Sequence, residues 1–484
     1  MDAACCNDDV CGDDCDDTLA DVRPGVAEIC NGRDDDCDFE SDEPEDGPPL
    51  CPGGVCTAGA CQLDAWIQTF GGAEVEEVFA VSMDRFAAVY AVGSFRGTAS
   101  FDGGDLTASI SAENQVVVAY DADGTPRWEH PLAGRFTSDP VIAADPDGSS
   151  VVVAGSFEQD LDLGDGTPFS RSGFHLFVAE LGGADGSVLD SVVLPDVRAR
   201  CSGVHFDGMN TVLVGDAFSG AIDGSVVEDG FLVALDPSLE VFDVRELTGA
   251  ADTRALAARP SGGFVLVSAG FGAVDLGCPD SVGGADTESV FLAGFRSDLS
   301  CDWIFGLEGS VDFWDVTVDE TGAVYASGDF FDSMDFGGGE RRSESGQNGV
   351  ILALSPLGAY DWDRTFHSPS SAELTGIAVT SDGVLAAGSF ETRLSIGGAT
   401  VGARSGTDSV VVELSRSGAY RGARTFESSE FDEAVDIAVG LGDSTTIVGG
   451  WSGSLTVDGT AYLSRMDGDG GFSRDVYVIR LSSS

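Results

Sequence analysis

Residues 89–95 read Val-Tyr-Ala-Val-Gly-Ser-Phe, and residues 101–104 read Phe-Asp-Gly-Gly. An apolar run that ends at a Gly-x-Phe corner, followed by a short run that stops at glycines, is typical of a β-hairpin. The corner returns along the chain, in a looser form at residues 215–218 and 270–271, with its glycine at positions 93, 155, 215, 270, 328, 388 and 449. Seven copies of a unit of about 60 residues indicate a repeat architecture.

From residue 64 onward, each unit can be divided into four strands. The first is an alternating run that ends in a tight turn, as at residues 78–83, 314–319 and 435–439. The second carries the corner, and the third is apolar throughout, at 116–121, 176–181, 231–236, 290–295, 350–354, 410–414 and 476–481. The fourth is amphipathic and often contains an aromatic residue, as at 66–70, 241–247, 303–307, 362–366 and 421–426.

The order of the first and last strands favours a closed ring. A strand of the fourth type, at residues 66–70, precedes the first complete unit, and the last strand, at 476–481, is of the third type. In a ring, the first strand can complete the last sheet. We therefore predict an all-β fold for residues 64–484, a seven-bladed β-propeller of four-stranded blades with strand-sharing closure. The alternative, an open solenoid of hairpins, has no use for a shared strand.

The same units resemble the bacterial β-propeller repeats of long secreted proteins, which read like Asn-Val-Tyr-Val-Thr-Gly-Ser-Phe and Phe-Val-Ala-Lys-Leu-Asp. The resemblance covers residues 64–484, and other residues fill the lysine position throughout. It implies the same fold and a secreted protein.

Residues 1–63 form a different module, with 18 acidic residues against two arginines and nine of the 12 cysteines. A segment with so little apolar surface needs disulfides, metal or both to become ordered. The candidates for pairing are Cys15, Cys30, Cys37, Cys51, Cys56 and Cys61, and in the repeats Cys278 with Cys301. The odd cysteine of the module is lipidated, free or bonded to Cys201.

Carboxylates in this module alternate in a way that suits a metal ion. Asp34, Asp36 and Asp38 are followed by further acids, so a curled loop could bring several oxygens to one centre, as in Ca²⁺-binding loops. The candidate ligands are Asp14, Asp16, Asp34, Asp36, Asp38, Glu40, Asp42 and Glu43. Phe39 occupies the position where such loops need glycine for a sharp turn. The alternative is an acidic tether that binds cations diffusely.

Residues 13–43 also resemble a metal-binding motif of many secreted proteins from myxobacteria and their relatives. The shared pattern is a Cys-Asp-Asp start, a Pro-Gly turn and a Glu-x-Cys-Asn-Gly-x-Asp-x-Asp-Cys-Asp run, with departures at Val26 and Phe39. A label attached to this family mentions copper. Because residues 13–43 contain no His and no Met, which softer metals prefer, we predict Ca²⁺ and no organic cofactor.

Charge and hydropathy exclude several classes of function. The net charge of −59 excludes general affinity for nucleic acid or anionic membranes, and no apolar run is long enough to cross a bilayer. Every basic residue is arginine, which fits either genomic G+C bias or adaptation to salt. The cysteines lead us to expect an extracellular or outer-surface protein whose export signal was removed or lies upstream. Ala3-Ala4-Cys5 is similar to the end of a lipoprotein cleavage box, but Asp2 stands where an aliphatic residue is expected.

The repeats contain no catalytic motif that sequence reasoning detects. His130, His175, His205 and His367 fall at different places within their units, and no nucleophile elbow or phosphate loop is present. Acidic residues that could line the rim of a channel are Asp145, Asp147, Asp216, Asp319 and Asp329. Their alternative role is to cap the backbone of hairpin turns.

We therefore predict a secreted or cell-surface, non-enzymatic binding, adhesion or scaffold protein. Its partner would be a protein or glycan at one face of the ring, with self-assembly or surface tethering as further options. The alternative is a propeller hydrolase or lyase that acts on polysaccharide. Acids converging with Arg or His at one channel mouth would favour the enzyme, whereas apolar side chains plugging the mouth would favour the binding protein.

Calorimetric titration of Ca²⁺ into metal-stripped protein tests the module. We expect saturable binding by the full chain and none by a chain that begins at Asp64, because the candidate carboxylates all precede that residue. Absence of saturable binding in the full chain would reduce residues 1–63 to an acidic spacer.

Overall fold

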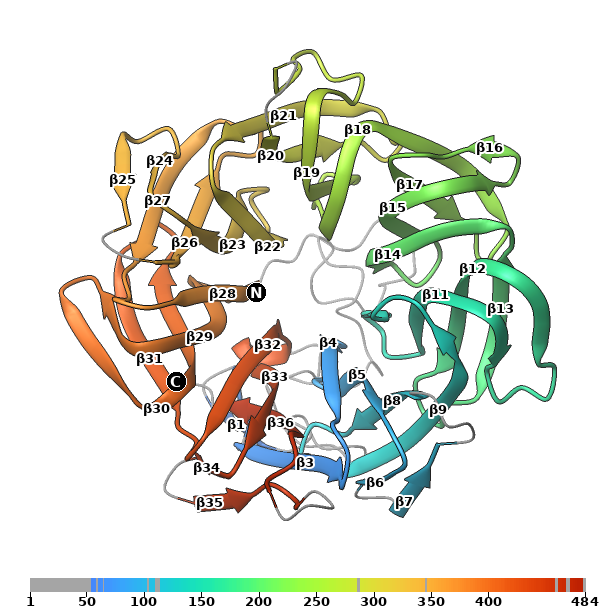
Figure 1. Cartoon of the computed structure of the whole chain (residues 1–484), viewed down its shortest axis with the longest axis horizontal. Helices are drawn as coiled ribbons and strands as arrows, with labels where there is room; N and C mark the ends of the chain where they lie inside the picture. The colour runs from blue at the N-terminus through green and yellow to red at the C-terminus, as the bar shows by residue number, and fades with distance from the viewer. Residues whose placement is uncertain are drawn as a thin grey trace, which may run out of the picture.

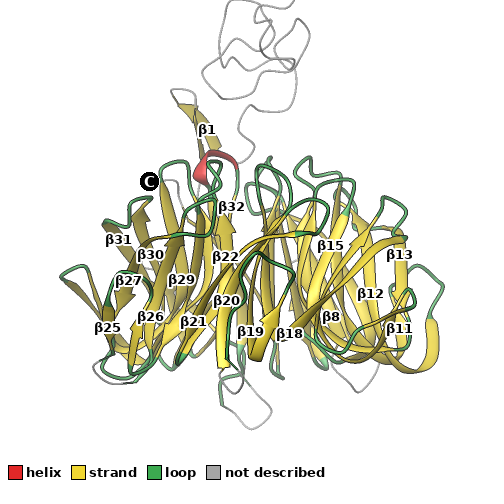
Figure 2. Cartoon of the chain, turned by 90° about the horizontal axis from the view of Figure 1, so that it is seen from above, coloured by secondary structure: helices red, strands yellow, loops and turns green. Residues whose placement is uncertain are grey.

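The computed structural model describes residues 54–57, 60–63, 65–101, 104–108, 114–284, 288–343, 346–457, 460–466 and 471–481. Within these residues the regular structure is β-strand, apart from one 3₁₀ turn, η1 (Leu441–Asp443). Antiparallel sheets are arranged in a ring around a central axis, and Figure 2 shows their strands running between two broad faces (Figures 1 and 2). No described helix is long and apolar enough to cross a membrane. This arrangement is a β-propeller.

The repeated unit is an antiparallel meander that starts at the axis and ends at the rim. In one unit, β22 (Val311–Val318), β23 (Val324–Phe330), β26 (Asn348–Leu354) and β27 (Tyr360–Phe366) pair in that order (Figure 1). The next comprises β28 (Ala372–Val379), β29 (Gly383–Ile396), β30 (Ala399–Ser415) and β31 (Tyr420–Phe426). Two earlier units have the same strand order. One comprises β4 (Glu77–Met83), β5 (Val89–Phe95), β8 (Asn114–Tyr120) and β9 (Pro126–Phe136). The other comprises β10 (Val141–Ala144), β11 (Ser150–Asp162), β12 (Phe169–Gly182) and β13 (Val188–Leu194).

Two neighbouring units share one long strand. β14 (Val197–Phe206), β15 (Thr211–Ile222) and β17 (Gly230–Leu235) lead into β18 (Val241–Ala258), which then pairs with β19 (Phe264–Asp275), β20 (Glu288–Phe295) and β21 (Cys301–Glu308). The first part of β18 pairs with β17 and the remainder with β19. The fourth strand predicted at residues 241–247 therefore continues without a break into the innermost strand of the next unit.

The middle strands of each unit are buried on both faces. Every residue of β5, β8, β23 and β26 is buried, because a neighbouring sheet covers each side of the unit. The apolar clusters accordingly lie between consecutive units, and one of them joins Val78 and Val89 to Val448 and Val476. This packing explains why the third strands read as continuous apolar runs rather than as alternating ones.

Two of the repeated corners place their aromatic residue differently from the others. Phe95, Phe157 and Phe330 are fully buried, whereas Phe218 and Phe271 are 63% and 66% exposed. The corners at residues 215–218 and 270–271 therefore do not repeat the geometry of the others, although the sequence predicts copies of one unit. One extra residue before Phe218 and one fewer before Phe271 shift the phenyl group by one position, which turns it to the other face of its strand.

The ring closes because its first strand pairs with its last strand. β3 (Trp66–Gly72) pairs antiparallel with β36 (Asp475–Leu481), so that β32 (Phe431–Val439), β33 (Thr445–Ser452), β36 and β3 form the last meander. This is the shared strand that the sequence predicted. Arg480, fully buried, donates to the carbonyl oxygens of Ala87 and Ala122 at 2.6 and 2.7 Å, and thereby braces β36 against the first unit.

Short hairpins extend from the ring, outside the strands described above. They comprise β6 (Thr98–Phe101) with β7 (Gly104–Thr107), β16 (Ser225–Val226), β24 (Ser333–Asp335) with β25 (Glu340–Arg342), and β34 (Ser454–Val457) with β35 (Thr460–Leu463). β1 (Gly54–Thr57) pairs with β2 (Ala60–Leu63), with Cys56 opposite Cys61 in the backbone register, and β2 lies beside η1 at one face of the ring (Figure 2). A disulfide joins Cys278 to Cys301, the pair that the sequence analysis named.

Replacing Arg480 with methionine tests the closure. We expect a loss of about 3 kcal/mol in unfolding free energy, because a buried hydrogen-bonded cation is removed while the two carbonyl groups stay buried. Arg296, whose side chain is 61% exposed in an ion pair with Asp302, supplies the control, and Arg296→Met should cost less than about 1 kcal/mol. Equal losses in denaturant titrations of the two variants would contradict a special role for Arg480.

Candidate functional site

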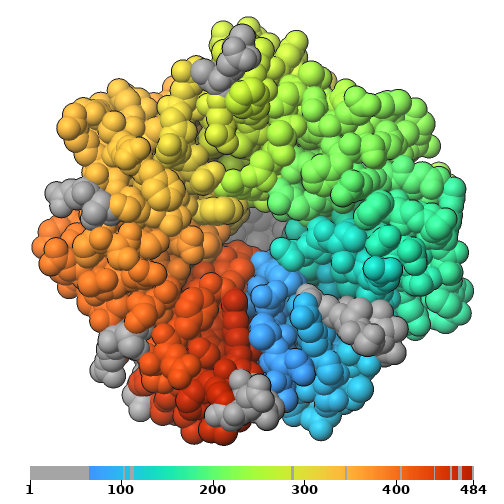
Figure 3. Space-filling model, in the orientation of Figure 1, coloured from blue at the N-terminus to red at the C-terminus, as the bar shows by residue number. Residues whose placement is uncertain are grey.

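The innermost strands enclose a hollow at the axis of the ring. Its volume is about 620 Å³, and residues of β4, β14, β18, β22, β28 and β32 line it, together with the segment that leads into β10. We call this space the axial hollow; Figure 3 shows the face of the molecule hollowed at its centre. A cavity of this size lies within the range of small-molecule and glycan pockets.

A β-bulge in the inner strands aims side chains into the hollow. The register of β4, β14, β18, β22, β28 and β32 against the second strand shifts by one residue in each case. The residues at these shifts, all of which line the axial hollow, are Phe79, Ser202, Arg254, Trp314, Thr375 and Val435. Bulges re-aim single side chains in this way next to functional sites. The chemistry at this position therefore differs from one unit to the next.

Two arginines and their carboxylate partners dominate one side of the hollow. Arg200 Nη2 contacts Asp216 at 3.2 Å and also bonds to Asp252. Arg254 donates from Nε and Nη2 to Asp252 at 2.8 and 2.6 Å, and its Nη2 contacts Asp312 at 2.9 Å. Both guanidinium groups are thus neutralised by carboxylates from neighbouring inner strands and the second strand.

Trp314 stands beside this group with its orientation fixed. The guanidinium carbon of Arg254 lies 4.2 Å from the centroid of the indole ring, a cation–π distance. The indole Nε1 donates to Asp329 Oδ1 at 2.6 Å. Trp314 is nevertheless 37% exposed and lines the axial hollow. It is therefore a prepositioned aromatic surface that faces the hollow.

The carboxyl groups around these side chains have pKa values shifted in opposite directions. Burial raises the pKa of Asp329 to about 6, against the hydrogen bond from Trp314. Burial also raises the pKa of Asp216. Burial acts in the same sense on Asp252, but the hydrogen bonds and charges of Arg254 and Arg200 outweigh it and lower the pKa. Asp252 is therefore held ionised.

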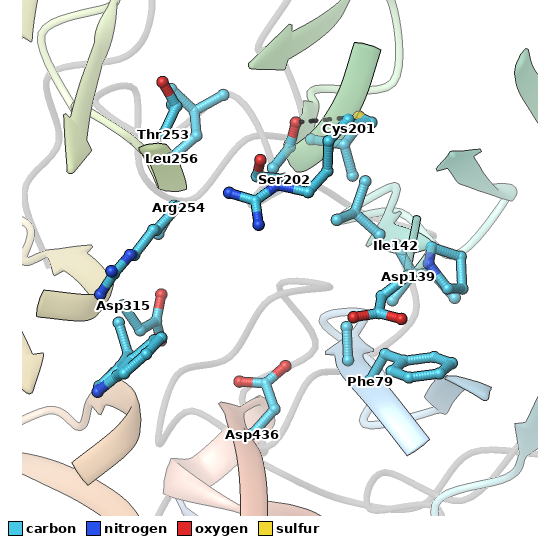
Figure 4. A pocket seen from close by; sticks show the side chains of 18 of the residues that line it. Phe79, Asp139, Ile142, Cys201, Ser202, Thr253, Arg254, Leu256, Asp315 and Asp436 are labelled. Carbon is cyan, nitrogen blue, oxygen red and sulfur yellow. Dashed lines mark hydrogen bonds between the residues drawn. The ribbon is translucent and has the colours of Figure 1, made fainter. Parts of the chain in front are cut away.

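Asp315 of β22 and Asp436 of β32 also face the hollow (Figure 4). Asp315 Oδ2 accepts from the Ile377 N–H at 2.9 Å, and Asp436 Oδ2 accepts from the Val81 N–H at 2.8 Å. Each carboxylate thus ties its inner strand to the inner strand of the next unit. Burial raises the pKa of both groups, and the neighbouring Asp436 carboxylate adds to the effect on Asp315.

The five acidic residues that the sequence predicted for a channel rim do not all lie near the hollow. Asp216 and Asp329 join the arginine and tryptophan group. Asp145 and Asp319 instead accept hydrogen bonds within their own turns, from the Asp147 N–H at 3.1 Å and the Thr321 N–H at 2.9 Å. Asp147 forms an exposed ion pair with Arg85. The turn-capping alternative therefore holds for Asp145 and Asp319.

The histidines and the lone cysteine of the repeats supply no catalytic group to the hollow. None of His130, His175, His205 and His367 is among its lining residues. Cys201 does line it, but the thiol is buried and free, which excludes the proposed bond to a cysteine of the module. The thiol is directed toward the Gly203 carbonyl, and burial raises its pKa to about 12, so it stays protonated at neutral pH.

The candidate metal ligands lie outside the described residues, as do Cys15, Cys30, Cys37 and Cys51. Among the residues that the structure describes, no group of three or more His, Cys, Asp or Glu side chains is placed to hold a metal ion. Residues 14–43 match a protein family described as "Putative metal-binding motif", whose name refers to copper.

Comparisons with solved structures give likenesses of low sequence identity. No curated protein sequence is similar to this chain. Solved structures with a similar arrangement include BamB from Moraxella catarrhalis, with 14% identity, a TM-score of 0.38, and coverage of 84% of this chain and 85% of that one. The Dos1 propeller has 10% identity, a TM-score of 0.44 and coverage of 87% and 96%. The phage phi92 endosialidase has 11% identity, a TM-score of 0.38 and coverage of 87% and 69%.

Sequence reasoning missed Arg200, Arg254 and Trp314. A signal was nevertheless present, because the bulge position carries a different residue in each unit whereas the surrounding apolar positions repeat. A comparison of the units at that position would have singled out an arginine and a tryptophan.

The raised pKa values predict stabilisation at mildly acidic pH. Burial raises the pKa of Asp329, Asp432 and Glu76 to about 6, 7 and 8. Because these values exceed those of unfolded carboxyls, near about 4, the stability that the three groups contribute falls as the pH rises from about 4 and is lost above their folded values of 6 to 8. We expect a higher Tm at pH 5 than at pH 8 in differential scanning calorimetry.

The variant Asp329→Asn isolates the contribution of Asp329 to the pH dependence of the Tm. Asp329→Asn keeps an oxygen acceptor for Trp314 but cannot titrate, so the fall in Tm around pH 6 should become less steep. Asp147→Asn, at an exposed turn, is the matched control. A Tm that rises steadily from pH 5 to pH 8 in the unmodified protein would contradict the expectation.

Proposed function

We propose that this chain is an extracellular or cell-surface binding protein without catalytic activity, built on a seven-bladed β-propeller and serving in adhesion or as a scaffold. The four-stranded meanders described above would form the seven blades. The observation that carries the proposal is the axial hollow, which is open, of ligand size and lined by two arginines that are already ion-paired with carboxylates and by an indole that is already hydrogen-bonded.

The chemistry of the hollow favours binding over catalysis. General acid–base catalysis needs a group that is free to exchange a proton with a substrate. Asp252 is held ionised between two arginines, Asp329 accepts from Trp314, and the thiol of Cys201 stays protonated. No histidine lines the hollow among the described residues. Charged groups that are held in place by ion pairs with one another suit recognition of a ligand.

A hydrolase or lyase that acts on polysaccharide is the second candidate. Acids and arginines do converge at the axis, which is the arrangement that the sequence analysis associated with an enzyme. Asp252 and Asp329 also have pKa values displaced in opposite directions, as the acid and the base of a glycosidase do. The ion pairs and hydrogen bonds of these carboxyls argue against this role.

The location and the metal are part of the same proposal. A disulfide in the repeats and nine cysteines in residues 1–63 suit an oxidising compartment, and the motif at residues 14–43 suits a bacterial secreted protein. Its donors are carboxylates without histidine, so we favour Ca²⁺. Asp34, Asp36 and Asp38 would hold the ion, which would order the module as a tether for the ring.

Surface plasmon resonance with immobilised full-length protein tests the proposal. The probes are dextran, alginate, chitosan oligomers and reduced casein, and each incubation is also assayed for new reducing ends and unsaturated sugars. We expect saturable binding of at least one probe and no product. Val435→Trp, which fills the hollow beside the inner strands, should abolish binding, whereas Val435→Ala should not. Product formation at a steady rate would overturn the non-enzymatic role.

A further inference from the structure

We infer that the axial hollow binds an uncharged glycan, with a sugar ring packed against Trp314 and its hydroxyl groups bonded to carboxylates of the inner strands. This inference rests on the proposed function, and it names the ligand class of the same site.

Trp314 supplies the apolar contact that a pyranose needs. Sugar rings present C–H groups on one face, which pack on aromatic surfaces whose faces carry partial negative charge. Trp314 is 37% exposed toward the hollow, and its side chain is held by Asp329 on one side and by Arg254 on the other. A ring that is already fixed loses little conformational freedom when a ligand packs on it.

The arginines argue against an anionic ligand. Arg200 is shared between Asp216 and Asp252, and Arg254 between Asp252 and Asp312. No net positive charge is therefore left to attract a carboxylate or sulfate group. The chain as a whole carries a formal charge of −59, so an anionic polymer is also repelled at long range.

A cationic ligand is disfavoured for a different reason. The guanidinium of Arg254 already occupies one face of Trp314, and the carboxylates Asp252 and Asp312 are paired with the same arginine. A ligand cation on that face would have to displace Arg254 and break these ion pairs, whereas a neutral sugar ring can pack on the exposed remainder of the indole.

The hydroxyl groups of a sugar can bond to Asp315 and Asp436, whose hydrogen-bonding positions are not all in use. Each oxygen of Asp315 accepts one backbone N–H, from Val316 and Ile377, at 2.7 and 2.9 Å. The oxygens of Asp436 likewise accept from Ile437 and Val81, at 2.7 and 2.8 Å. A carboxyl group has more hydrogen-bonding positions than these two backbone bonds use, so each group retains capacity for a hydroxyl group of the ligand, whether it is ionised or protonated. Both carboxyl groups line the hollow (Figure 4).

The closing experiment compares dextran, alginate and chitosan oligomers by isothermal titration calorimetry with the full-length protein. Dextran should bind, and the two charged polymers should bind at least tenfold more weakly or not at all. Trp314→Ala should weaken dextran binding by about tenfold or more, while Trp314→Phe, which keeps an aromatic ring, should retain part of the affinity. Phe271→Ala, which removes a ring that is 66% exposed and lies outside the hollow, should leave the affinity unchanged.

The outcomes separate this inference from the proposed function. Binding of alginate or chitosan instead of dextran, still lost in Val435→Trp, would overturn the ligand class and leave a non-enzymatic binding protein. Dextran binding that is accompanied by new reducing ends would overturn the non-enzymatic role and keep the ligand class. Unchanged dextran affinity in Trp314→Ala, with a Tm equal to that of the unmodified protein, would overturn the placement of the sugar on Trp314.

Discussion

The whole ring depends on the pairing of β3 with β36. Without it the last unit would lack its outer strand, and the sheets would form an open curve with two exposed edges. Closure also brings Val78 and Val89 against Val448 and Val476, so the first and last units share one apolar cluster. The axial hollow follows from this closure, because its lining strands come from units along the whole chain.

The inner strands combine two requirements within a few residues. Apolar side chains must pack into the clusters between consecutive units, and polar side chains must face the axis. The bulge resolves this conflict by inserting one residue that turns inward while pairing resumes on either side. Arg254 and Trp314 occupy adjacent bulges in consecutive units, which is why their side chains can stack although 60 positions separate them.

Strand positions and closure could be predicted from the sequence because both depend on local patterns that recur. The apolar runs, the glycine corners and the strand at residues 66–70 all repeat with one period. The contacts within the arginine and tryptophan group could not be predicted, because they join residues of different units, even though a comparison of the units at the bulge would have singled out Arg254 and Trp314. The same one-residue sensitivity explains Phe218 and Phe271, whose corners differ in length by a single residue. The carboxylates of residues 14–43 lie outside the described residues.

Arginine has two structural uses in this protein. Arg480 donates to the carbonyl groups of Ala87 and Ala122, and other arginines brace neighbouring units through backbone carbonyls, as Arg364 does with Gly418 at 2.5 Å. Others pair with carboxylates, as Arg465 does with Asp475 at 3.2 Å. Arg200 and Arg254 belong to this second group, and what sets them apart is that they line the axial hollow. The planar guanidinium suits both uses, because it presents several N–H donors to carbonyl or carboxylate oxygens at once.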